Sequence, residues 1–317
     1  MKPGRLATLR QATGPFIPLA VLLSLLGVIG VVNPPFLSLG NLGVLADESS
    51  VILLLATAQT LVILLGCIDL SMAALAGLAS VLIALAVPTM GGLGVLGVLA
   101  LSTLAGAFQG FVHARAQLPS VVVTLAGLGM WSGIALTIAH ATIPVDAGYS
   151  AVAWLDGTYF GLPGSFAFAA GALVVLAAAL RWLPLGRHVH AIGLSPKVAV
   201  LSGIRVDRVK VLAFAVAGLF AGLAGMTMVA RTSSGNPTIA DSLLLPCIAA
   251  VVMGGTAMTG GVGGLGRTLI GALTVTLLRA GITAAGVDPA FEPIAYGILL
   301  VLAVALTADR RRAAVTK

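Results

Sequence analysis

The sequence predicts an all-α, polytopic membrane protein with about ten transmembrane helices and with both termini in the cytoplasm. Three observations support this fold class. Of the 317 residues, 59% are hydrophobic and only 9% are charged, whereas a soluble domain has about 25% charged residues. The apolar residues form long continuous runs, and the basic residues are distributed unequally between the segments that separate these runs. The 40 glycines suit helices that pack closely through small residues in lipid.

A window of about 20 residues divides the apolar runs into spans. The predicted spans cover residues 14–32, 44–66, 71–87, 92–112, 121–140, 165–183, 212–230, 243–258, 268–286 and 291–307. Proline, glycine and polar residues separate them, as in "NPPFLSLGN" after the first span, "VPTMGG" after the third and "LPS" before the fifth. Longer breaks are the segment 142–164 and the polar block 184–210. We expect residues 1–317 to form a single transmembrane domain.

The charge distribution orients the spans by the positive-inside rule. With ten spans and a cytoplasmic N-terminus, 15 of the 17 basic residues fall on the cytoplasmic side, and Arg231 is the one basic residue outside the membrane on the other side. Acidic residues gather on that other side: Asp47, Glu48, Asp146, Asp156, Asp241, Asp288 and Glu292. An odd number of spans would misplace one terminal basic cluster. We therefore predict a multi-pass membrane protein in contact with anionic lipid and with no nucleic-acid partner.

Nucleotide and metal chemistry find little support in the sequence. No P-loop consensus is present, so the energy for any transport must come from an ion gradient or from a partner subunit. "GVGGLG" (261–266) matches a dinucleotide-binding pattern, but a membrane span follows it, so we interpret it as a glycine turn. His188 and His190 have no further ligands nearby, and we predict no metal site. The chain is predicted to be non-catalytic.

Asp69 is an acid between two apolar spans, in "LLGCIDLSMAALAG". If "CIDLS" is a short turn, the carboxylate caps the next helix and accepts hydrogen bonds from amides near Met72. If it is a break within a longer helix, Asp69 faces a polar cavity and contacts the transported solute. Capping is the interpretation that we favour. Residues that could line a path for a hydroxyl-rich solute are Gln59, Thr60, Asp69, Ser71, Gln109 and Thr124, with hydrogen bonding between helices as the alternative for each.

Four motifs, in order along the chain, resemble one family. They are "LLGCIDLSMAALAGLAS", "LPSVVVTLAGLGMWSGIAL", "GRHVHAIGLSPKVAVLSGIRVDRVK" and "IAAVVMGGTAMTGGVGGLGRTLIGA". The family is the ribose-type permease subunit of bacterial ABC importers, and the similarity covers nearly the whole chain. Cys67 stands where the family usually has glycine, residues 244–247 replace a usual acidic pair, and Arg279 stands where asparagine is usual. We expect Arg279 to reach the outer membrane surface or to pair with Asp288, with a role in the pore as the alternative.

This resemblance implies a multi-pass protein of a bacterial inner membrane. It also implies two permease chains, identical or paralogous, that form a pore for a sugar or sugar-like solute. A periplasmic solute-binding protein would supply the solute, and a cytoplasmic ATPase subunit would use ATP, with no cofactor bound by this chain. An ion-coupled secondary transporter is the alternative function.

We predict that the segment 184–210 docks on the ATPase through a short helix, with Ser195 as its cap, Pro196 in its first position, Val198–Leu201 as its apolar surface and Gly203 at its end. The coupling residues are Arg187, Gly193, Ser195, Pro196, Lys197, Ala199 and Gly203, and the glycine turn contains Gly254, Gly255, Gly260, Gly261 and Gly263.

Overall fold

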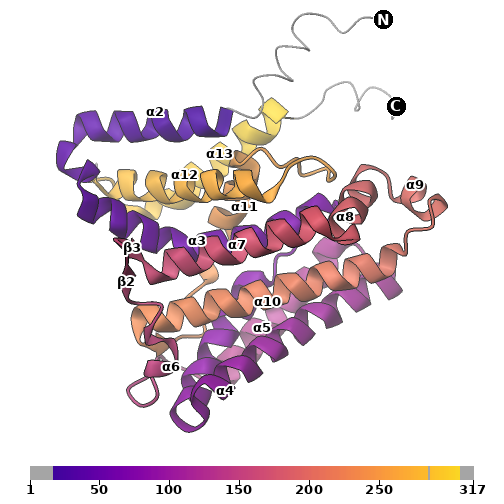
Figure 1. Ribbon diagram of the computed structural model, residues 1–317, viewed down its shortest axis with the longest axis horizontal. Helices are drawn as coiled ribbons and strands as arrows, with labels where there is room; N and C mark the ends of the chain where they lie inside the picture. The colour runs from indigo at the N-terminus through magenta and orange to yellow at the C-terminus, as the bar shows by residue number, and fades with distance from the viewer. Residues whose placement is uncertain (1–16, 285, 308–317) are drawn as a thin grey trace, which may run out of the picture.

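The computed structural model describes residues 17–284 and 286–307, and the described chain is built almost wholly of helices that lie side by side (Figure 1). The helices are α2 (Ile17–Val32), α3 (Leu39–Leu64), α4 (Met72–Arg115), α5 (Ser120–Ile138), α6 (Ser150–Ala153), α7 (Gly164–Trp182), α8 (Pro184–Leu194), α9 (Pro196–Leu201), α10 (Val206–Thr232), α11 (Leu244–Met253), α12 (Leu265–Ala284) and α13 (Glu292–Thr307). Single 3-10 turns are η1 (Pro34–Leu37), η2 (Asp241–Leu243) and η3 (Pro289–Phe291). Two-residue strands form two antiparallel pairs, β1 (Ile143–Pro144) with β4 (Ser234–Gly235) and β2 (Thr158–Tyr159) with β3 (Leu162–Pro163).

Within the described residues, α3, α4, α5, α7, α10 and α12 are the 6 helices long and apolar enough to cross a membrane. The predicted all-α polytopic architecture is therefore confirmed, and within the described residues each predicted span overlaps a helix. One span is shorter than expected: α11 has 10 residues, or about 15 Å of helix, against a hydrocarbon core of about 30 Å. The number of ten crossings stays a prediction. Both chain ends lie outside the described residues.

Helix α4 consists of two helical arms that meet at Gly91 and fold back on each other. Gly91 has φ 54° and ψ −133°, which is not helical, and a Cβ placed on Gly94 would lie 2.8 Å from the Cβ of Ala86. In a straight helix these two residues would be about 12 Å apart. Glycine is required at position 91 because other residues rarely adopt this conformation. The reversal explains how 44 residues, about 66 Å if straight, correspond to the two predicted spans 71–87 and 92–112.

Helix α10 packs against both arms of α4 through glycine. A Cβ on Gly225 would lie 2.6 Å from the carbonyl oxygen of Ala76 in the first arm. A Cβ on Gly110, in the second arm, would lie 2.9 Å from the Cα of Val211 near the other end of α10. Such backbone approach is how transmembrane helices associate. These contacts fix the two arms on one side of α10.

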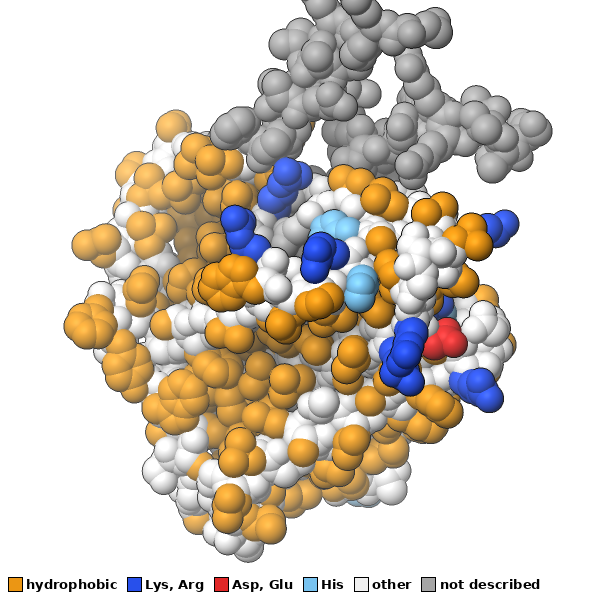
Figure 2. Space-filling view, turned by 45° about the vertical axis from the view of Figure 1, so that its right-hand side comes forward, with side chains coloured by type: hydrophobic (Ala, Val, Ile, Leu, Met, Phe, Trp, Pro, Cys, Tyr) orange, Lys and Arg blue, Asp and Glu red, His pale blue; other side chains and the backbone are white. Residues whose placement is uncertain are grey.

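Helix α3 forms the centre of the molecule. All of residues 49–64 are buried, because α7, α10, α11 and α12 each pack against this helix. The outer faces of the surrounding helices expose large apolar side chains, such as Leu93 and Leu104 on α4 and Val175 on α7, which suits contact with lipid. Figure 2 shows this apolar surface over the body of the molecule, and Lys and Arg side chains gathered at the end that carries α8 and α9.

Candidate functional site

A buried turn between α3 and α4 holds Asp69. Its Oδ1 atom accepts hydrogen bonds from the backbone amide of Ser71 at 2.8 Å and from the Ser71 hydroxyl at 2.6 Å, and the residue is only 3% exposed. Because α4 begins at Met72, the carboxylate satisfies an amide that the first helical turn leaves free and lies at the positive end of the helix dipole. This geometry corresponds to the capping interpretation of Asp69.

Gln109, in the second arm of α4, is hydrogen-bonded to the same turn. Its Nε2 donates to the Ser71 hydroxyl oxygen at 2.9 Å, and the Oε1 atom lies 3.1 Å from that oxygen. The Ser71 hydroxyl has one proton, which we assign to the shorter bond with Asp69. Gln109 is 2% exposed. Asp69, Ser71 and Gln109 therefore form one buried polar network that joins the two arms of α4.

Helix α5 packs against the same turn and adds further hydrogen bonds beside this network. The Ile68 amide donates to the Ser120 hydroxyl at 3.1 Å, and Thr124 Oγ1 donates to the Ser120 carbonyl at 2.9 Å. Gly127 faces Gln109 and Ser71 so closely that a Cβ would overlap the Gln109 amide. The structure thus brings together four of the six predicted pathway residues, and their polar atoms bond to one another and to nearby backbone.

The other two predicted pathway residues lie farther back along α3. The Thr60 hydroxyl lies 2.7 Å from the hydroxyl of Thr268 on α12, which is the predicted alternative of hydrogen bonding between helices. Gln59 is fully buried, and neither its Nε2 nor its Oε1 has a hydrogen-bond partner among the described residues. Burial of an unpaired amide costs about 1–3 kcal/mol. Gln59 is therefore the predicted pathway residue whose side chain lacks hydrogen-bond partners among the described residues.

Four glycines bring three distant segments into backbone contact, and we call them the glycine junction: Gly66 after α3, Gly193 in α8, and Gly260 and Gly261 in the turn between α11 and α12. The Gly261 amide donates to the Leu64 carbonyl at 2.9 Å. A Cβ on Gly260 would lie 2.7 Å from the Gly66 nitrogen and 3.1 Å from the Gly193 Cα. A Cβ on Gly193 would overlap the atoms of the Gly261–Leu64 hydrogen bond. A side chain at Gly193, Gly260 or Gly261 would therefore overlap neighbouring atoms, whereas a Cβ on Gly66 would meet only an ordinary contact at 3.5 Å.

The remaining members of the predicted glycine turn shape the chain around this junction. Gly255 and Gly263 have φ angles of 79° and 136°, and a Cβ on Gly254 would lie 2.7 Å from the carbonyl oxygen of Arg267 in α12. Together they end α11 early and hold its C-terminal end against α12. The segment 261–266 precedes α12, which is an apolar helix long enough to cross a membrane, as expected for a glycine turn before a membrane span.

The predicted coupling segment contains two helices, of which the sequence had indicated only the second. Helix α9 begins at Pro196 with Ser195 as its N-cap, whose hydroxyl accepts from the Val198 amide at 3.4 Å, and Gly203 follows it with φ 79°. These three expectations are confirmed. Arg187 and Lys197 are exposed on α8 and α9.

Ala199 does not belong to the exposed surface of α9, contrary to our expectation. It is 2% exposed, whereas Val198, Val200 and Leu201 are 59%, 59% and 88% exposed. The methyl side chain of Ala199 instead packs in the hydrophobic core, because a helix of six residues presents one side inward. The exposed apolar surface of this segment therefore consists of Val198, Val200 and Leu201.

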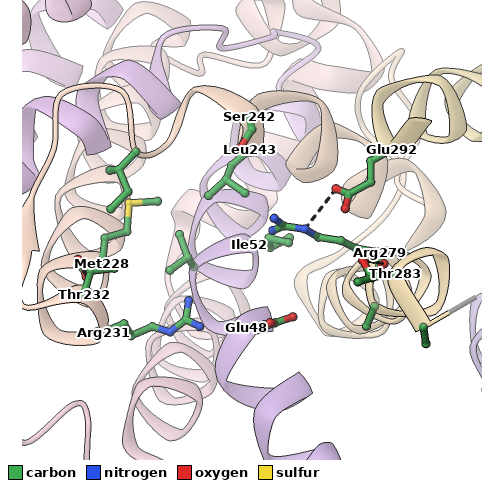
Figure 3. Close-up of a pocket in the computed structure, with 14 residues that line it drawn as sticks. Glu48, Ile52, Met228, Arg231, Thr232, Ser242, Leu243, Arg279, Thr283 and Glu292 are labelled. Atoms are coloured by element: carbon green, nitrogen blue, oxygen red, sulfur yellow. Dashed lines mark hydrogen bonds and ion pairs between the residues drawn. The ribbon is translucent and has the colours of Figure 1, made fainter. Parts of the chain in front are cut away.

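A cavity of about 650 Å³ lies at the other end of α3, between α3, α10, η2, α12 and α13 (Figure 3). Its walls include Val51, Ile52, Met228 and Leu243. The polar lining residues are Glu48, Arg231, Thr232, Ser242, Arg279, Thr283 and Glu292. We call it the two-arginine cavity. In the sequence, Glu48, Arg231 and Glu292 served only to orient the chain, and Arg279 was considered by itself. The signal for a shared site was that Arg231 is a basic residue on an otherwise acidic side.

The ion pairs of this cavity differ from expectation. Arg279 Nε lies 3.2 Å from Glu292 Oε2, so the predicted pairing with Asp288 is wrong. Asp288 Oδ1 instead accepts a hydrogen bond from the Ala290 amide at 2.8 Å. Glu292 is the first residue of α13, and that helix places its carboxylate beside α12.

Comparison with known proteins gives consistent matches over nearly the whole chain. The family described as branched-chain amino acid transport system / permease component matches residues 42–304. The ribose import permease protein of Bacillus subtilis (strain 168) is 33% identical over 96% of this chain and 94% of its own length. The fructose import permease protein of Rhizobium meliloti is 32% identical over 92% and 84%, and the autoinducer 2 import permease protein of Photorhabdus laumondii is 28% identical over 94% and 90%. No solved structure matches the chain with comparable significance.

Proposed function

We propose that this chain forms the membrane pathway of an ATP-driven importer for a sugar or sugar-like solute. The chain belongs to the branched-chain amino acid transport system / permease component family. Within that family it is a ribose-type ABC permease of the inner membrane. The solute class follows from relatives that are named for ribose and fructose import. We further propose that the whole chain is one transmembrane domain with both termini in the cytoplasm. On this proposal, the chain itself is non-catalytic.

The proposed assembly has three kinds of partner. A second copy of the chain or a paralogue completes the pathway, a periplasmic solute-binding protein delivers the solute, and a cytoplasmic ATPase subunit binds and hydrolyses ATP. The exposed apolar residues of α9 and the basic residues of the segment 184–210 supply a surface of mixed character for docking the ATPase. This surface lies at the end of the molecule where Lys and Arg side chains gather (Figure 2).

The glycine junction is the observation that supports the ATP-driven mechanism most directly. Gly193 belongs to the segment that we assign to ATPase docking, and the atoms nearest to its Cβ position are backbone atoms of Leu64 at the end of α3 and of Gly261 in the α11–α12 turn. A displacement of α8 cannot be absorbed by side-chain rotation at such contacts, since none of the glycines has a side chain to rotate. Movement of the docking segment is therefore expected to pass to the buried turn that holds Asp69, only three residues beyond Gly66.

Uptake by reconstituted liposomes tests this function. The chain would be purified with the ATPase and binding protein encoded beside it, and uptake of ribose or fructose would be measured with ATP inside the liposomes. We expect uptake that requires ATP, the binding protein and an intact ATPase active site. Uptake that follows an imposed proton or sodium gradient and ignores ATP would instead support the secondary transporter.

A further inference from the structure

We propose that the two-arginine cavity is a solute-binding site that opens on the periplasmic side and takes a neutral, polyhydroxylated molecule. This inference rests on the proposed function, which supplies the orientation of the chain. It adds a place and a chemistry for solute binding at the end of α3 opposite the network of Asp69. The volume of about 650 Å³ falls within the range of about 300–1,000 Å³ that is usual for small-molecule sites.

The first argument concerns hydrogen-bond donors. Arg231 binds Asp47 through Nε at 2.8 Å, and Arg279 binds Glu292 through Nε at 3.2 Å. Among the described residues, the terminal nitrogens of neither guanidinium have a hydrogen-bond partner. Each arginine is thus held from one edge and keeps its planar pair of terminal NH₂ groups available. Figure 3 shows both guanidinium groups extending into the space in front of α3.

The second argument concerns acceptors and net charge. The Glu48 carboxylate lines the same cavity and has no hydrogen-bond donor among the described residues. The lining therefore contains two cations, Arg231 and Arg279, and two anions, Glu48 and Glu292, while Asp47 neutralises Arg231 from behind and is also bound by the Ser165 hydroxyl. Two positive and three negative groups, counting Asp47, give no net attraction to an anion. The free guanidinium edges of Arg231 and Arg279 repel a cation and require hydrogen-bond acceptors, so the lining favours a neutral solute that carries such acceptors.

Hydroxyl groups satisfy both kinds of unpaired group at once. A hydroxyl accepts from a guanidinium and donates to a carboxylate, so a molecule with several hydroxyls can bond to Arg231, Arg279 and Glu48 together. Val51, Ile52, Met228 and Leu243 supply apolar walls for the C–H faces of such a molecule. A few convergent polar groups on an apolar surface are typical of sites that bind small solutes.

Helix α3 runs from this cavity into the interior of the protein. Ile52 lines the cavity, and Gln59 lies seven residues farther along the same helix, or about 10 Å. The unpaired amide of Gln59 can also bond to hydroxyls as both donor and acceptor. On the face of α3 that carries Ile52, Gln59 is therefore the next polar position that a solute leaving the cavity would approach.

Thiol protection tests the site directly. Ser242 lines the cavity and is exposed, and the native Cys67 and Cys247 are 5% and 0% exposed, so a membrane-impermeant methanethiosulfonate should label Ser242→Cys selectively. The variant would be assembled with its ATPase and binding protein in nanodiscs. Ribose, fructose and ribitol would be tested as neutral probes, gluconate as a sugar acid, and glycerol 3-phosphate as a probe for phosphate groups, including those of lipids.

We expect the neutral sugar that the wild-type complex imports to protect Ser242→Cys. At about four times its dissociation constant, occupancy leaves roughly one fifth of the sites open, so labelling slows about fivefold. Adding Arg279→Lys keeps the charge but removes the planar fork, and Glu48→Gln removes the charged acceptor. Each should raise the dissociation constant of the sugar about tenfold, so that the same sugar concentration slows labelling only about 1.4-fold. Arg115→Ala removes an exposed arginine that does not line the cavity, and protection should persist.

Two results would overturn the inference while leaving the proposed function intact. One is ATP-driven uptake of a neutral sugar that does not protect Ser242→Cys, or protects it equally with Arg279→Lys and Glu48→Gln present. The other is protection by glycerol 3-phosphate or gluconate in preference to neutral sugars, which would assign the cavity to an anionic group. Absence of ATP-driven uptake by the wild-type complex would count against the proposed function itself and remove the premise of this inference.

Discussion

Replacing Gly260 by alanine should destabilise the protein at the glycine junction. The expected loss in the free energy of unfolding has two parts, one from backbone strain and one from steric overlap. Gly260 has φ 86°, and an alanine held in the left-handed region costs about 1–2 kcal/mol. The added Cβ would also lie 2.7 Å from the Gly66 nitrogen and 2.8 Å from its Cα. Ordinary contact needs a displacement of about 0.7 Å or more, and overpacking of this kind costs about 1–3 kcal/mol. The sum is about 2–5 kcal/mol.

Gly161 provides a matched control for the backbone part. Its φ angle is 83°, and a Cβ placed on it meets nothing within 4 Å. Gly161→Ala should therefore destabilise the protein by only about 1–2 kcal/mol. The difference between the two variants isolates the contact between Gly260 and Gly66, and we expect it to be about 1–3 kcal/mol.

Two assays measure the consequence of the Gly260→Ala substitution. Unfolding of the purified chain in detergent gives the difference in stability between the two alanine variants. The ratio of solute imported to ATP hydrolysed in proteoliposomes gives coupling, which should fall for Gly260→Ala and stay normal for Gly161→Ala. Equal destabilisation of both variants, together with an unchanged coupling ratio, would refute the claim that the junction is a rigid backbone connection.

Three further predictions concern the other features. Asp69→Asn should retain folding and most uptake because asparagine caps nearly as well, whereas Asp69→Leu should cost about 1 kcal/mol locally and reduce assembly; loss of uptake in a normally assembled Asp69→Asn complex would indicate a charge-dependent role. Leu201→Asp, at a residue 88% exposed, should weaken co-purification of the ATPase and leave the melting temperature of the isolated chain unchanged, while full retention of the ATPase would place the docking surface elsewhere. Reporter fusions at Lys317 and near Gly148 should report opposite sides of the membrane, and the ten-span topology fails if they report the same side.

The helices could be predicted from sequence because the apolar runs have the length of a bilayer. The reversal at Gly91 was indicated by "VPTMGG", and the cap at Ser195 by a serine that precedes proline. The length of α11 was not predictable in the same way, since the apolar residues continue through "VVMGGTAM" although the helix ends at Met253. Hydropathy reports whether residues avoid water, and the residues of a buried turn are as apolar as those of a buried helix. The end of α11 therefore leaves no trace in the hydropathy of the sequence.

The candidate site was predictable only in part. Asp69 was noticeable because an acid within an apolar run needs a local partner, and that partner, Ser71, is two residues away. Gln109 and Gly127 join the same network from other helices, and the sequence contains no sign of that proximity. The two-arginine cavity depends on α3, α10, α12 and α13 meeting at one end, which is a property of helix packing. Ala199 was placed wrongly because a six-residue helix is too short for its pattern to reveal which side faces inward.

The burial of α3 has a consequence for biogenesis. This helix leaves the ribosome before every helix that later surrounds it, and Thr60 must wait for Thr268, which is synthesised 208 residues afterwards. At about 5–20 residues per second, that interval is roughly 10–40 s. During it, Thr57 and Thr60 can bond to the carbonyls of Leu53 and Ala56 in their own helix, whereas the Gln59 amide has no such local partner. Between residues 51 and 64, Gln59 is therefore the one polar side chain that enters the bilayer without a partner in its own helix. The later packing of α7, α10, α11 and α12 against α3 is what finally removes it from contact with lipid.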